Sequence, residues 1–238
     1  MSIASNIARI QEQIAQACTR CGRSETEVAL MAVSKMHPAD AIAEACGAGI
    51  RIFGENRVQE WQQKQPRLTE LIGTSSPPQV HLIGPLQSNK TSRAAELFDR
   101  IDTVDSLRTA TRLNQTATEL NKKLPVLIEV KLSHEQTKHG IAPNELAALL
   151  EQIEALDSIL VTGLMTVPPW SEDPVPARPY FRELRRLRDE LLPRYAALTQ
   201  LSMGMSNDFQ VAIEEGSTCV RIGTAIFGKR QYPESGNA

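Results

Sequence analysis

Residues 28–53 read VALMAVSKMHPADAIAEACGAGIRIF, and our fold prediction starts from this stretch. The apolar run Val28–Ser34 is typical of a buried strand, Ala39–Ala48 is rich in helix-forming residues, and Arg51–Phe53 is again strand-like. A strand, a helix and a second strand in this order indicate two parallel strands joined by a crossover helix. The stretch therefore predicts an α/β protein built on a parallel sheet.

The same alternation of strand-like and helical segments continues to residue 227. The remaining predicted strands are Val80–Ile83, Ile101–Val104, Val126–Val130, Leu160–Met165, Leu201–Met203 and Cys219–Ile222. The remaining predicted helices are Val58–Leu71, Lys90–Phe98, Leu107–Lys122, Asn144–Ala155, Pro179–Leu192 and Asp208–Glu215. Eight βα units in a chain of 238 residues, with no linker between them, favour a single closed (β/α)8 barrel of the TIM type over an open sheet.

An extra helix precedes these units, because Ile3, Ile7, Ile10 and Ile14 recur at helical spacing. This amphipathic segment is not typical of a signal peptide, and no stretch approaches the roughly 20 apolar residues that cross a bilayer. The formal charge of -2 gives no general attraction to nucleic acid or anionic lipid. We therefore expect one cytoplasmic domain covering residues 1–238, monomeric because its outer helices show no oversized apolar face, with no membrane or nucleic-acid partner.

Two further motifs each allow two interpretations. Cys18 and Cys21 form a C-x-x-C pair, but no second pair accompanies them, which favours helix packing over a metal site. Residues 168–179 read PPWSEDPVPARP, and their prolines break both helix and sheet. This segment follows the sixth predicted strand, so in a barrel it lies on the C-terminal face as either a mobile lid or a rigid spacer.

Lys35 ends the first predicted strand, although lysine is rarely buried without a partner. At the inner end of a barrel strand, desolvation favours the neutral amine, which attacks carbonyl groups. The alternative is a lysine that only extends to solvent at the barrel rim.

A phosphate site is predicted at the same mouth. Ser206 and Asn207 begin a helix, and Gly223 and Thr224 follow the eighth strand. Small residues with free backbone N–H groups suit an anion, and phosphates commonly bind after strands seven and eight of such barrels. Ordinary turn chemistry is the alternative explanation for these residue types.

A ligand that carries both an aldehyde for Lys35 and a phosphate is pyridoxal 5′-phosphate. Arg221, just before the phosphate loop, is then positioned to face the pyridine ring. The alternative for Arg221 is an ion pair with a carboxylate such as Glu55 or Glu129.

Four collinear segments carry a family resemblance: AVSKMHPADAIAEACGAGIRIFGENRVQE, HLIGPLQSNK, GLMTV and SMGMSNDFQVAIEEGSTCVRIGTAIFG. Over about residues 5–230 the chain resembles the pyridoxal phosphate homeostasis protein family. The resemblance implies a barrel similar to the N-terminal domain of alanine racemase (fold type III), with the cofactor held as an internal aldimine on Lys35. It implies that Asn56 lies near the ring, that Arg221 approaches the pyridine nitrogen, and that other residues hold the phosphate or line the pocket. The implied phosphate-binding residues are Ser206, Gly223 and Thr224, and the implied pocket-lining residues are His81 and Met165.

The resemblance also implies a role in intracellular cofactor buffering and delivery to apo-enzymes that depend on pyridoxal phosphate, with indirect effects on amino-acid and keto-acid balance. A cation facing the ring nitrogen disfavours its protonation and weakens the electron sink that catalysis on amino acids requires. The three tyrosines, Tyr180, Tyr195 and Tyr232, do not end predicted strands, and the chain stops some eight residues after the FGKR segment, without room for the second domain of a racemase. We expect a carrier without established catalytic residues.

Two other functions remain open from the sequence. The first is a single-domain racemase or lyase acting on amino acids, with Lys35 as its sole base or with a partner protein supplying the second. The second is a phosphosugar-binding barrel that holds no pyridoxal cofactor.

Overall fold

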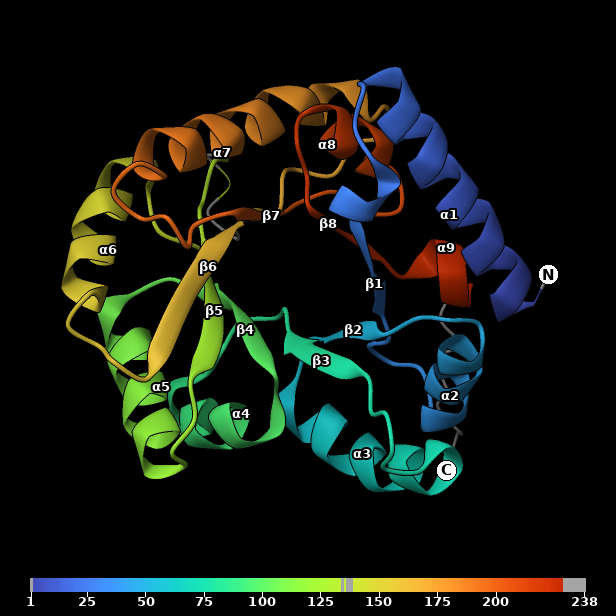
Figure 1. The fold of residues 1–238 in the computed structure, drawn as a ribbon, viewed down its shortest axis with the longest axis horizontal. Helices are drawn as coiled ribbons and strands as arrows, with labels where there is room; N and C mark the ends of the chain where they lie inside the picture. Colours follow the sequence, from blue (N-terminus) through green and yellow to red (C-terminus); the bar gives the residue numbers. More distant parts are fainter. Residues whose placement is uncertain (1, 134, 136–138, 229–238) are drawn as a thin grey trace, which may run out of the picture.

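A computed structural model describes residues 2–133, 135 and 139–228 of the chain. Its parallel strands close into a barrel in which each strand pairs with its neighbours in chain order and β8 pairs with β1. Helices surround this barrel on its outer side (Figure 1). The predicted (β/α)8 architecture is confirmed.

The strands are β1 (Ala29–Val33), β2 (Ile52–Glu55), β3 (Gln79–Leu82), β4 (Arg100–Val104), β5 (Leu124–Glu129), β6 (Ile159–Met165), β7 (Gln200–Ser202) and β8 (Cys219–Ile222). The helices are α1 (Ile3–Arg20), α2 (Ala39–Gly47), α3 (Val58–Ile72), α4 (Thr91–Leu97), α5 (Leu107–Glu119), α6 (Leu146–Ile153), α7 (Arg178–Leu191), α8 (Phe209–Glu214) and α9 (Thr224–Phe227). Strands β1 to β8 follow the eight predicted strands closely, and α1 is the predicted extra helix. The short α9 is an addition that the sequence did not predict.

The segment predicted as irregular over residues 168–179 is shorter in the structure. A 3₁₀ turn forms at Val175–Ala177, and α7 begins at Arg178. Pro179 does not prevent this start, because the first turn of a helix has no intrahelical partner for the backbone N–H that proline lacks.

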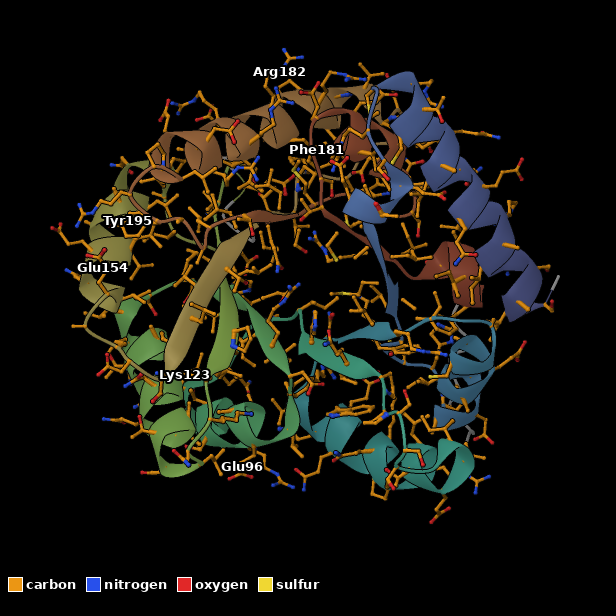
Figure 2. All side chains as sticks on the ribbon, viewed as in Figure 1. Glu96, Lys123, Glu154, Phe181, Arg182 and Tyr195 are labelled. Carbon is orange, nitrogen blue, oxygen red and sulfur yellow. The ribbon has the colours of Figure 1, made fainter. Side chains whose placement is uncertain are left out.

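The main apolar core lies between the barrel and its helices. Helix α7 illustrates the arrangement: Phe181 points toward the barrel and is fully buried, whereas Arg182 points outward (Figure 2). The arginine-rich α7 forms ion pairs with α8 and the residue after it, including Arg178 with Glu214 at 2.6 Å. Cys18 of α1 is also buried in this core, which agrees with its predicted packing role.

The interior of the barrel contains a polar layer. Arg100 on β4 donates through Nε to Asp102 Oδ1 at 2.7 Å, and it also donates to Gln200 on β7. His81 on β3 lies beside Asp102, with 3.9 Å between Nδ1 and Oδ1. Charged groups are therefore buried beneath the C-terminal mouth of the barrel, where water cannot solvate them freely.

Candidate cofactor site

A cavity of about 500 Å³ opens at the C-terminal ends of the strands. Six of the eight predicted binding residues line it: Lys35, Asn56, Ser206, Arg221, Gly223 and Thr224. They come from the segments after β1, β2, β7 and β8, including the start of α9, and from β8 itself, so the parallel barrel brings together residues that are far apart in sequence.

Lys35 lies in a tight turn directly after β1. The turn is closed by the backbone N–H of His37, which donates to the Ser34 carbonyl at 3.0 Å. Met36 has φ 64, a left-handed conformation that is uncommon for residues other than glycine. Lys35 is half-buried and lines the cavity.

Arg221 is buried at the base of the cavity. Its guanidinium donates to Ser202 Oγ and to the Thr166 carbonyl, both at 2.8 Å. Burial lowers the pKa of Arg221, partly offset by nearby acidic groups. Glu55 was one suggested ion-pair partner of Arg221. Its carboxylate instead accepts hydrogen bonds from Ser34 and Lys64.

The turn before α8 forms one wall of the cavity. Asp208 accepts a hydrogen bond from the backbone N–H of Met205 at 2.6 Å, which holds Ser206 and Asn207 in a tight loop. Burial raises the pKa of Asp208, although this hydrogen bond and the charge of Arg221 oppose the shift. After the neighbouring strand β8, Gly223 packs so closely that an added Cβ would lie 3.3 Å from the Val33 carbonyl oxygen.

Asn207 also connects this wall to the proline-rich segment. Its side-chain nitrogen donates to the carbonyl oxygens of Ser171 and Glu172, at 2.7 and 3.0 Å. Trp170 lines the cavity beside this link and is 72% exposed. The loop is therefore bound to the cavity wall at one point while its aromatic side chain stays in solvent.

His81 and Met165 do not line the cavity, which corrects the predicted pocket. They are 3% and 1% exposed, and the cavity-lining residues lie two positions further on, at Ile83 and Val167, just past the ends of β3 and β6. Because inward-facing side chains alternate with outward-facing ones, both predicted residues are one inward position too deep. The stagger of the strands decides this depth, and it cannot be read from one strand alone.

Several lining residues were not predicted: Val33, His37, Asp208 and Trp170. Val33 could have been found from its two-residue spacing to Lys35, whereas the position of Trp170 depends on the path of its loop. The His37 ring stacks on Phe227 of α9, with ring centroids 4.8 Å apart. Tyr232 lies outside the described residues.

The chain matches the family model "Alanine racemase, N-terminal domain" over residues 5–231. It is 43% identical over 233 residues to the pyridoxal phosphate homeostasis protein of Aquifex aeolicus, covering 98% of this chain and 100% of the relative. This chain belongs to the pyridoxal phosphate homeostasis protein family.

Two solved structures place this family member among its neighbours. PipY of Synechococcus elongatus, with PLP bound, superposes with a TM-score of 0.84 at 40% identity, covering 95% of this chain and 100% of PipY. Alanine racemase of Clostridium difficile matches with a TM-score of 0.67 at 17% identity, covering 98% of this chain but 58% of the racemase. The second likeness concerns the fold alone.

Two features are absent from the described residues. No helix among them is long and apolar enough to span a membrane. Within residues 2–133, 135 and 139–228, no group of three or more histidine, cysteine, aspartate or glutamate side chains is arranged to hold a metal ion.

Proposed function

We propose that this chain binds pyridoxal 5′-phosphate through the amine of Lys35 and acts as a reversible store of the cofactor. The observation that supports this most directly is that Lys35, Arg221 and the Gly223–Thr224 turn line one cavity. A volume of about 500 Å³ lies within the usual range for small-ligand sites. When bound, the cofactor supplies an aldehyde that reacts with amines.

Each part of the cofactor has a matching group in the cavity. The Lys35 amine suits the aldehyde, and the Ser206 hydroxyl and the close-packed Gly223 turn suit the phosphate. Arg221 and Asn56 are left for the ring. Glycine fits at position 223 because an added Cβ would approach the Val33 carbonyl oxygen to 3.3 Å.

Arg221 favours a carrier over an enzyme. Its guanidinium donates to two neutral oxygens, so neither contact removes its positive charge. A cation at the pyridine nitrogen keeps that nitrogen unprotonated and weakens its capacity to accept electrons. We therefore propose that the chain buffers the cofactor and transfers it to apo-enzymes that require it. We further propose that residues 1–238 form one monomeric cytoplasmic domain.

One observation favours catalysis as a second candidate. His37 lines the cavity together with Lys35, so an imidazole is available as a second acid or base. A racemase or lyase would use the pair to remove and return an α-proton of an amino acid. Incubation of the loaded protein with L-amino acids in deuterated water tests this: α-deuterium incorporation at several turnovers per second supports catalysis, and its absence supports the carrier.

The central test is spectroscopic. Purified protein incubated with pyridoxal phosphate is expected to show a near-visible absorption band that shifts on borohydride reduction and leaves a covalent adduct on Lys35 by peptide mass spectrometry. Lys35→Ala should lose both signals. Lys123→Ala is the matched control, because Lys123 precedes β5 at the opposite end of the barrel (Figure 2). An unchanged band in Lys35→Ala would refute the anchor, and a colourless wild-type protein would support the phosphosugar alternative.

Delivery has a separate test. The loaded protein is mixed with an apo-enzyme that requires pyridoxal phosphate, and recovery of that enzyme's activity is followed over time. Dialysis of the loaded protein gives the concentration of cofactor that it releases spontaneously. If the loaded protein restores activity faster than free cofactor at that concentration does, the result supports transfer. Recovery limited to the rate of spontaneous release contradicts direct delivery while leaving storage in place.

A further inference from the structure

Three charged side chains lie behind the turn that carries Lys35 and do not line the cavity. Lys64 of α3 places its Nζ 2.9 Å from Glu55 Oε1 and 2.6 Å from Glu60 Oε1. The side chains of Lys64, Glu55 and Glu60 are 11%, 0% and 21% exposed. Removing an ion cluster from water costs free energy unless the charged groups make several good hydrogen bonds.

The other contacts of this ion cluster go to the backbone on both sides of Lys35. Ser34 donates its hydroxyl to Glu55 at 2.7 Å, and its carbonyl oxygen accepts from Lys64 Nζ at 2.9 Å. The backbone N–H of Met36 donates to Glu60. The cluster therefore holds the residue before Lys35 and the residue after it.

The conformation of Met36 shows why such support matters. Its φ of 64 is disfavoured for most residues that carry a Cβ, because Cβ crowds the backbone. Met36 is 50% exposed, so core packing does not impose this conformation. Strained backbone persists where surrounding contacts determine it, and here the contacts are the Glu60 hydrogen bond and the Ser34–His37 turn.

We propose that Glu55, Glu60 and Lys64 form a positioning cluster that fixes the turn from which the Lys35 amine enters the cavity. This inference rests on the proposed function. In the step that it assists, the amine nitrogen adds to the cofactor aldehyde, a carbon–nitrogen double bond forms, and the aldehyde oxygen leaves as water. No oxidant or reductant is consumed. The cluster does not contact the phosphate side of the cavity, so it affects covalent attachment rather than phosphate binding.

The test compares attachment with non-covalent binding. Apo-protein is mixed with pyridoxal phosphate, and the rate of attachment is followed by absorbance and by borohydride trapping. Binding of pyridoxine 5′-phosphate, which has the phosphate but an alcohol in place of the aldehyde, is measured separately. Lys64→Met is expected to slow attachment about tenfold, because small misplacements of a reacting group are costly, while changing pyridoxine 5′-phosphate affinity less than twofold.

Two substitutions of Glu60 and one control variant test the proposal further. Glu60→Ala should slow attachment more than Glu60→Gln, since the glutamine oxygen still accepts the Met36 N–H. Arg67→Met is the control, because Arg67 lies on the same helix and also has two carboxylate partners, Asp40 at 3.4 Å and Glu70 at 3.2 Å, but it is exposed and its ion pairs do not involve the Lys35 turn. Arg67→Met should behave as wild type.

Two results would overturn the proposal. One is an unchanged attachment rate in Lys64→Met and Glu60→Ala. The other is an equal loss of pyridoxine 5′-phosphate affinity, which indicates general damage to the site. If Lys64→Met does not fold, the comparison of Glu60→Ala with Glu60→Gln decides the question. A wild-type protein that binds pyridoxine 5′-phosphate but never traps pyridoxal phosphate contradicts the proposed function instead.

Discussion

His81 makes the barrel interior sensitive to acid. Its pKa is lowered from 6.5 to about 4, chiefly by burial; Asp102 opposes the shift and Arg100 contributes to it. In the unfolded chain this imidazole takes up a proton below about pH 6.5, whereas in the folded chain it stays neutral until about pH 4. The stability that His81 contributes is therefore present above pH 6.5 and is lost as the pH falls toward 4. At about 1.36 kcal/mol per pH unit, the expected loss is about 3 kcal/mol.

Urea denaturation at several pH values between 7.5 and 4 measures this contribution. Other groups also titrate in this range, so the useful quantity is the difference in unfolding free energy between wild type and His81→Asn at each pH. That difference should shift by about 3 kcal/mol in favour of the variant as the pH falls. His139→Asn is the control, because His139 is exposed. A shift below about 1 kcal/mol for His81→Asn would refute a neutral buried imidazole.

Three further predictions concern the site and the core. Gly84→Ala should lower both the melting temperature and cofactor retention, because the new Cβ would lie 2.3 Å from the Asn56 carbonyl oxygen; Gly47→Ala, with open space around it, should lower neither. Asn207→Ala removes the link to the 171–172 backbone and should speed cofactor release severalfold in a dialysis or stopped-flow assay; an unchanged release rate contradicts a restraining loop. Phe181→Ala should cost about 3–5 kcal/mol in urea denaturation while leaving the absorption band of the loaded protein unchanged, and loss of the band would show that core and site are coupled.

The sequence predicted those site residues that lie at or just after the ends of strands. Lys35 follows the first strand and Arg221 lies on the last, and a closed parallel barrel must bring these strands together at one mouth. The roles assigned to these residues remain proposals, but their shared cavity was predictable. His81 and Met165 show the limit, because their depth in the barrel depends on how neighbouring strands are staggered.

The sequence by itself determined the order of strands and helices, since periodicity and residue type are local properties of the chain. It also located the ends of the strands to within two residues. Only the tertiary structure decided which inward-facing side chains reach the cavity, and that Lys64 of α3 joins Glu55 behind Lys35. Such contacts depend on how helices dock and how strands are staggered, and these follow from packing across the whole barrel rather than from any single segment.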